Sequence, residues 1–219
     1  MKMVAPLLAS LLAASACAIT STCASAGTFP TILNTSFDCA RASASIEKLI
    51  CRDPQLKRME IELTRLYRLV LTDDHSVPRP DKVEAEQRFW VLERNACASE
   101  AEPKACTIRS YAERAFQLRQ GSAIARTKDP SRMTEGPVAF RCERLNALVA
   151  ATYFTIEPGV VYLKWANASV TLSQVPSDYA TLYTGKDSKG SYSFSQNGAD
   201  VLLQIPGSGT LRCMAEPVG

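Results

Sequence analysis

The sequence has very few of the residues that metal and redox centres require. It contains a single histidine, His75, and none of its 8 cysteines stands in a C-x-x-C pair. Zinc sites use several clustered cysteine and histidine ligands, and thioredoxin-like centres use two cysteines separated by two residues. The sequence therefore predicts no metal site, no dithiol redox centre and no cofactor.

The short motifs of common enzymes are also absent. The chain has no G-x-S-x-G nucleophile elbow and no glycine-rich phosphate loop. His75 stands beside Asp73 and Asp74 in the segment TDDHSVPRP, a composition typical of a solvated turn. The other carboxylates are scattered among lysines and arginines, as on exposed helix faces. We therefore expect no catalytic activity.

Long apolar runs and an excess of one charge are missing after the first 26 residues. No segment there reaches the roughly 18 consecutive apolar residues of a membrane-spanning helix. The formal net charge of the chain is only +3, and acidic and basic residues nearly balance in each half. Nucleic acids and anionic membranes bind strongly basic surfaces. The sequence thus predicts no membrane span and no nucleic-acid partner.

The first 26 residues, MKMVAPLLASLLAASACAITSTCASA, indicate a secretory signal peptide. Lys2 precedes an apolar run, and small residues precede Gly27. The alternative is a lipoprotein anchored through Cys17, because the segment ASAC resembles a degenerate lipoprotein cleavage site. Cleavage there would leave Cys23 without a partner in an oxidising compartment. We expect a soluble protein in the periplasm or secreted from the cell.

Removal of Cys17 and Cys23 from the 8 cysteines leaves six, which an oxidising compartment converts most simply into three disulfides. Six cysteines allow many pairings. Proximity along the chain favours two disulfides that close short loops and one that closes a long loop. Each short-loop disulfide should stabilise the fold by about 3 kcal/mol and the long-loop disulfide by roughly 4.5 kcal/mol. The pairs favoured in this way are Cys39–Cys51, Cys97–Cys106 and Cys142–Cys213.

Residues 29–120 have the hydrophobic period of helices. Asp53 suits the N-cap and Pro54 the first position of an amphipathic helix. Apolar residues then recur at three- and four-residue spacing up to Leu71. A second helix is expected in DKVEAEQRFWVLERNAC. A third helix is expected from about Pro103, and Gly121 can end it.

The second half of the chain has a different period. Residues 121–138 are rich in Gly, Ser, Thr and Pro and have no period, which indicates a linker. Residues 139–219 alternate between apolar and polar in short runs separated by EPG, GKDSKG, QNG and PGSG. This pattern is typical of a small antiparallel barrel or sandwich. The predicted fold class is α+β in two domains, with helices first and strands second.

The helical half closely resembles the lysozyme inhibitor LprI N-terminal domain family over about residues 37–119. The resemblance lies in FDCARASASIEKLICRDPQLKRMEIELTRLYRLVL, QRFWVLERNAC and CTIRSYAERAFQLR. Four cysteines, a Q-R-x-W block and the helical frame fall in order, which implies that the cysteines form that family's disulfides. The matching residues are Asp38, Cys39, Glu47, Ile50, Cys51, Leu56, Leu63, Tyr67, Gln87, Arg88, Trp90, Arg94, Cys97, Cys106, Tyr111 and Arg114.

Residues 139–217 resemble the C-type lysozyme inhibitor family, MliC and PliC. The similarity lies in FRCE, YFTIEPGVVYLKWANASVTLSQVPS, YATLYTG, YSFSQNGADVLLQ and LRCMA. The resemblance implies a small eight-stranded antiparallel β-barrel with a bridge like Cys142–Cys213, placed after a disulfide-bonded helical N-terminal domain. It also implies inhibition by a loop that enters the lysozyme cleft and contacts the catalytic carboxylates.

Two motifs carry the inhibition in that family. The first, a Ser/Gly-rich loop that ends in tyrosine, appears here as VPSDYATLY, with Ser177 and Tyr183 in place and Tyr179 between them. An alanine replaces its usual glycine. The second, an aromatic-x-Lys-Gly segment, appears as FSQNGADV. Gly198 is kept there, and Asn197 stands where lysine is expected.

The asparagine weakens the expected contact. A lysine beside a buried carboxylate makes a charge-assisted hydrogen bond of roughly 1.5–3 kcal/mol, whereas asparagine offers a neutral one. Lys186 and Lys189, in the adjoining turn, either supply a replacement charge or are solvated loop lysines. Ser177 either binds a catalytic carboxylate or belongs to a turn after Pro176.

The function implied by both resemblances is an exported inhibitor of C-type lysozyme with no catalysis of its own. The barrel would block the active-site cleft, and the helical domain would add a second contact or a targeting role. The alternative is a non-inhibitory interaction module of the cell envelope, which the residue at 197 favours. A cell-wall hydrolase has no residues to support it.

Overall fold

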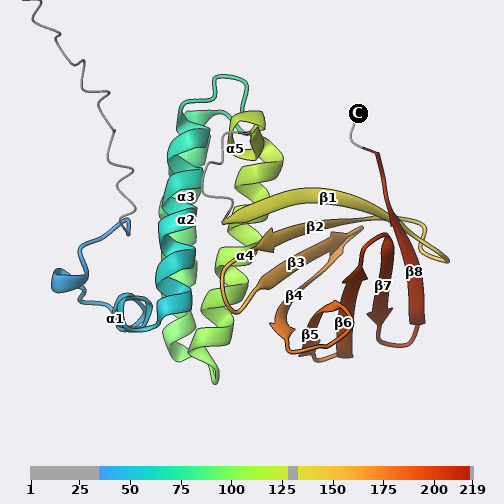
Figure 1. Ribbon diagram of the computed structural model, residues 1–219. Coiled ribbons are helices and arrows are strands. Elements are labelled where there is room, and N and C mark those ends of the chain that lie inside the picture. Colours follow the sequence, from blue (N-terminus) through green and yellow to red (C-terminus); the bar gives the residue numbers. More distant parts are fainter. Residues whose placement is uncertain (1–34, 128–132, 218–219) are drawn as a thin grey trace, which may run out of the picture. The chain divides into compact units, whose positions relative to one another are not determined.

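Helices make up the first part of the described chain and strands the second (Figure 1). The computed structural model describes residues 35–127 and 133–217. The predicted signal peptide and the alternative anchor at Cys17 lie outside these residues. The described residues all belong to one compact unit, Leu33–Gly219.

The helices begin where the sequence supplies good helix starts. Asp53 accepts hydrogen bonds from the backbone N–H groups of Gln55 and Leu56, each at 3.0 Å, and so caps the helix that begins at Pro54. Two further helices also begin at a proline, where the missing N–H costs nothing. The helices are α1 (Ser45–Arg52), α2 (Pro54–Leu71), α3 (Pro80–Ala96), α4 (Pro103–Gly121) and α5 (Ala123–Thr127), with 3-10 turns at Cys39–Arg41 and Cys97–Ser99.

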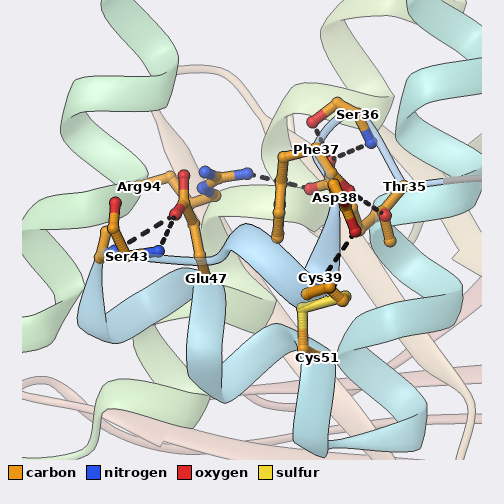
Figure 2. Close-up of a disulfide and its surroundings, with 12 residues drawn as sticks. Thr35, Ser36, Phe37, Asp38, Cys39, Ser43, Glu47, Cys51 and Arg94 are labelled. Carbon is orange, nitrogen blue, oxygen red and sulfur yellow. Dashed lines mark hydrogen bonds and ion pairs between the residues drawn. A yellow bond between two sulfur atoms is a disulfide. The ribbon is translucent and has the colours of Figure 1, made fainter.

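Two disulfides hold the ends of these helices. Cys39–Cys51 joins the first 3-10 turn to α1, and Figure 2 shows it with Phe37 and Arg94 in its surroundings. Cys97–Cys106 joins the turn after α3 to the first turn of α4. Both predicted pairs are confirmed.

The strands form a closed antiparallel barrel in which each strand pairs with the next and β8 pairs with β1. Cys142 and Cys213 lie opposite each other on this closing pair and form the third predicted disulfide. The predicted fold class, a disulfide-bonded helical part followed by an antiparallel barrel, is confirmed. The strands are β1 (Thr134–Cys142), β2 (Leu148–Phe154), β3 (Val160–Trp165), β4 (Ala168–Val175), β5 (Thr181–Asp187), β6 (Gly190–Asn197), β7 (Asp200–Ile205) and β8 (Gly209–Ala215).

Side chains of alternate strand residues fill the barrel interior, but β2 and β3 are buried on both faces. Their inward residues, such as Val161 and Leu163, belong to the barrel core. Their outward residues, including Phe154 and Val160, belong instead to the helical core. The ring of Phe116 on α4 lies 5.3 Å from that of Tyr162, centroid to centroid. The helices therefore cover one part of the outer barrel wall.

Polar contacts also join the helices to the barrel. The side chain of Gln55 donates to the carbonyl oxygen of Pro158 at 2.8 Å, and Arg119 Nε donates to that of Gly136 at 2.7 Å. Residues 121–138, predicted to be a linker, include α5 and the first residues of β1. The lack of a hydrophobic period there reflects the shortness of these pieces. The division into two domains stays a prediction.

Candidate binding site at one end of the barrel

The loops of an up-and-down barrel alternate between its two ends. One end, here called the candidate end, carries the β2–β3 loop (155–159), the β4–β5 loop (176–180), the β6–β7 turn (198–199) and the start of β1. The other end carries the remaining four connections. The residues that the sequence singled out divide between the two ends.

Four of those residues belong to the candidate end. Ser177 and Tyr179 lie in the β4–β5 loop, where Ser177 is exposed and Tyr179 is 86% exposed. Asn197 is the exposed last residue of β6, and Gly198 follows it in the turn. Gly198 has a φ of +60°, in the left-handed region that suits glycine, and open space surrounds the position of a Cβ.

Tyr183 lies inside the barrel. Its side chain is 7% exposed and packs against the rings of Tyr153, at 6.2 Å, and Phe194, at 6.5 Å. Burial raises the pKa of Tyr183, with a further contribution from the negative charge of Glu135. Tyr183 therefore supports the base of the β4–β5 loop and does not form its surface.

Lys186 and Lys189 lie at the opposite end of the barrel. Thr181 pairs with Gln196, next to Asn197, whereas Lys186 pairs with Ser191 at the far end of the same hairpin. The two pairs are five residues apart along β5, roughly 17 Å at about 3.4 Å per residue. The expectation that these lysines supply a charge beside Asn197 is therefore wrong in geometry. Closeness in sequence misled it, because the full length of a strand separates the two ends.

Ser177 lines a small cavity between two loops of the candidate end. The cavity, of about 650 Å³, also includes Glu157 and Pro158 of the β2–β3 loop and Gln174 of β4. The Ser177 side chain is exposed and makes no hydrogen bond to residues 35–127 or 133–217.

The mouth of the barrel forms a larger cavity, of about 790 Å³, which the sequence did not reveal. Its lining includes Glu135, Tyr153, Tyr183, Gln196, Asp200 and Arg212. The Tyr153 hydroxyl is buried and finds no hydrogen-bond partner among the described residues. Alternation along β1 could have placed Glu135 on the inward face of a strand. The sequence interpretation missed it because it assigned residues 121–138, which include Glu135, to a linker.

Charge differs between the two ends although the barrel is nearly neutral. Among the residues that the structure describes, the loops and strand termini of the candidate end carry no basic residue of their own. Two arginines of other elements reach this end: Arg212 of β8 lies 3.7 Å from the Asp200 carboxylate, and Arg58 of α2 donates to the carbonyl oxygen of Glu157 at 2.9 Å. The acidic residues of these loops and strand termini are Glu135, Glu157, Asp178 and Asp200. The opposite end carries Arg144, Lys186 and Lys189 against Glu143 and Asp187. The candidate end is therefore the acidic one.

The helical part has an open groove of about 1270 Å³ between α3, α4 and β4. The Arg114 side chain lies in it, 4% exposed, and donates to Gln87 and Gln117, each at 3.0 Å. Its Nη2 atom finds no partner among the described residues. Desolvation lowers the pKa of Arg114 against the opposing effect of Glu86. Phe89 on the groove edge is 63% exposed.

Two further features bear on the class of site. Within residues 35–127 and 133–217, histidine, cysteine, aspartate and glutamate side chains nowhere gather in a group able to hold a metal ion. The described helices are too short or too polar to cross a bilayer.

Comparison with known proteins gives a distant similarity. The chain is 30% identical over 136 residues to proteins named lipoprotein LprI from Mycobacterium bovis and Mycobacterium tuberculosis. The match covers 62% of this chain and 64% of the relatives, so the chain spans less than two thirds of their length. No family model and no solved structure matches the chain. The relatives' name and the three disulfides agree with a location outside the cytoplasm.

Proposed function

We propose that the protein is an exported inhibitor of C-type lysozyme whose candidate barrel end closes the active-site cleft of the enzyme. The two sequence resemblances support this proposal, and so does the distant similarity to lipoprotein LprI. The observation that carries it is the exposed β4–β5 loop, with Tyr179 86% exposed at its tip, on a closed barrel. A loop held on a rigid frame loses little conformational entropy when it binds.

The contacts proposed for this loop are hydrogen bonds from neutral groups. The Ser177 hydroxyl would donate to one catalytic carboxylate of the enzyme, and the Asn197 amide would approach the other. Each neutral hydrogen bond contributes about 0.5–1.5 kcal/mol. Tyr179 would contribute contact area, since aromatic side chains dominate such interfaces.

Charge supports the choice of this end. C-type lysozymes are basic proteins, and the candidate end carries four carboxylates against two nearby arginines, Arg212 and Arg58. Complementary charge accelerates the encounter of two proteins more than it raises their affinity. The association rate should therefore fall as salt is added.

The test is the lysis of a bacterial cell suspension by a C-type lysozyme in the presence of the exported chain. The whole chain is needed because outward residues of β2 and β3, such as Phe154, pack in the helical core. We expect stoichiometric inhibition that Tyr179→Ala weakens about tenfold or more, as loss of a central aromatic contact does. Lys189→Ala, at the opposite end, is the control and should inhibit like the wild type.

The alternative, a non-inhibitory interaction module of the envelope, is favoured by one observation. Asn197 replaces the expected lysine, and the two lysines considered as substitutes lie at the other end of the barrel. If the folded protein at micromolar concentration has no effect on lysis by the enzyme, this alternative is favoured.

We also propose export, to the periplasm or the medium. The name of the relatives favours attachment through a lipid on Cys17 over a soluble chain that begins at Gly27. The intact mass of the exported protein separates the two, because lipidation adds acyl chains to a cysteine and signal-peptide cleavage leaves an unmodified glycine.

A further inference from the structure

Glu135 is an exposed acidic residue on the face of β1 that turns toward the barrel mouth. Its neighbour Thr134 points outward, where its hydroxyl contacts Glu62 of α2 and Arg119 of α4. Successive strand residues face opposite sides, so Glu135 faces the barrel mouth, where it pairs with Tyr153 of β2. Glu135 makes no ion pair with residues 35–127 or 133–217.

An aromatic group lines the same cavity as this carboxylate. The ring of Tyr153 lies 6.2 Å from that of Tyr183 and 6.5 Å from that of Phe194, centroid to centroid. Tyr153 is 8% exposed, and its hydroxyl has no hydrogen-bond partner among the described residues. The amide side chain of Gln196 lines the same cavity.

These groups suit a cation. Aromatic faces attract lysine and arginine through the ring quadrupole, and a carboxylate adds a charge-assisted hydrogen bond. Arg212 also lines the mouth, but its guanidinium lies 3.7 Å from the Asp200 carboxylate, and Glu135 has no ion-pair partner among the described residues.

We propose that the barrel mouth binds a lysine or arginine side chain of the basic partner, in addition to the contacts of the β4–β5 loop. This inference rests on the proposed function, because it takes the basic lysozyme as the source of the cation. The cation would lie between Glu135 and the rings of Tyr153 and Tyr183, in a cavity of about 790 Å³. A neutral side chain of the same shape would leave the carboxylate without a partner.

The cavity can be tested without lysozyme. The exported full chain is titrated with propylguanidinium chloride and with its neutral analogue propylurea, and binding is followed by NMR shifts of the residues that line the mouth. We expect propylguanidinium to bind at least tenfold more tightly than propylurea, and Glu135→Gln to remove the difference. Equal binding of the two compounds, or no binding of either, would overturn the proposal.

A second measurement places the cation on the partner. Glu157→Gln is the matched control. It removes the same charge as Glu135→Gln, at the same end of the barrel but outside the mouth cavity. We expect Glu135→Gln to raise the dissociation rate of the lysozyme complex about tenfold, and Glu157→Gln to change the association rate alone. Equal effects of the two variants would overturn the mouth contact. If the wild type binds propylguanidinium but not lysozyme, the mouth binds a cation as proposed, but the proposed function is wrong and lysozyme is not the partner.

Discussion

Glu60 and Arg94 form a buried ion pair, with Arg94 Nη1 2.9 Å from Glu60 Oε2 and both side chains 2% exposed. The Tyr111 hydroxyl donates to the same carboxylate oxygen, and the guanidinium lies 5.3 Å from the Trp90 ring centroid and 5.7 Å from that of Phe37. Figure 2 shows Arg94 next to Phe37. The pair therefore joins α2, α3, α4 and the N-terminal turn.

Replacing one partner of this pair should destabilise the protein strongly. Arg94→Met leaves a buried carboxylate without compensation, and such changes cost about 3–5 kcal/mol in the free energy of unfolding. Urea denaturation measures the change. In the double variant with Glu60→Leu, the loss should be smaller than the sum of the single losses, because the uncompensated charge is gone.

The matched control is the exposed pair of Arg141 and Glu216, with N–O distance 2.6 Å and side chains 66% and 31% exposed. Arg141→Met should cost no more than about 1 kcal/mol. A loss at Arg94 as small as at Arg141 would contradict the structural role of the buried pair.

The shared core predicts that the helices and the barrel unfold together. Each part carries one tryptophan, Trp90 on α3 and Trp165 on β3. Fluorescence of Trp90→Phe then reports on the barrel and that of Trp165→Phe on the helices, and we expect coincident urea transitions after correction for each variant's own stability. Phe116→Ala removes the ring packed on Tyr162. With either tryptophan as the reporter, it should lower the free energy of unfolding by about 3–5 kcal/mol. Two separate transitions would instead support independent domains.

Alkaline pH should weaken the barrel through its buried tyrosines. Burial raises the pKa of Tyr153 above its usual value of 10.0, and Tyr183 adds to this effect. The folded state favours the neutral phenol, so the buried tyrosine contributes fully to the free energy of unfolding below pH 10. As the pH rises above 10 this contribution is lost, at up to about 1.4 kcal/mol per pH unit.

Tyr153→Phe tests this dependence. At neutral pH the variant should be as stable as the wild type or more so, because it removes a buried hydroxyl without a partner. Above pH 10 its unfolding free energy should fall less steeply, as measured by urea denaturation at several pH values. Tyr111→Phe is the contrast, since it loses a hydrogen bond to Glu60 and should be less stable at neutral pH. Identical slopes in Tyr153→Phe and the wild type would exclude a contribution from Tyr153.

Asn197→Lys tests whether this position approaches a catalytic carboxylate of lysozyme. A charge-assisted hydrogen bond exceeds a neutral one by about 1–1.5 kcal/mol, so inhibition should strengthen roughly tenfold. Lys186→Asn, at the other end of the barrel, should leave the inhibition constant unchanged. No gain from Asn197→Lys would mean that residue 197 lies outside the interface.

The parts of the fold that local chemistry decides could be predicted from the sequence. The cap at Asp53 and the proline after it fixed the start of α2, and Gly121 ends α4 as expected. The disulfides followed from the order of the cysteines. Alternation and turn segments indicated a small β structure, and the resemblance specified a barrel.

Features that depend on tertiary contacts could not be predicted. The strand VVYLKW has an apolar residue at nearly every position because it is buried on both faces, yet a single sequence cannot say which other element covers the outer face. Glu135 appeared to be a linker residue because Gly136 and Pro137 follow it, at the point in β1 where the register with β2 shifts. The position of Lys186 depended on which end of the barrel its turn occupies.

The double burial of β2 and β3 also sets how freely the barrel can vary in sequence. Most of its strands tolerate polar substitution at every second position, since one side of each faces solvent. The segment from Val160 to Leu163 has no such position, because its side chains alternate between two cores. Divergence within the barrel should therefore concentrate in the strands away from the helices, and this short segment should stay apolar even in sequences whose loops have changed their partner.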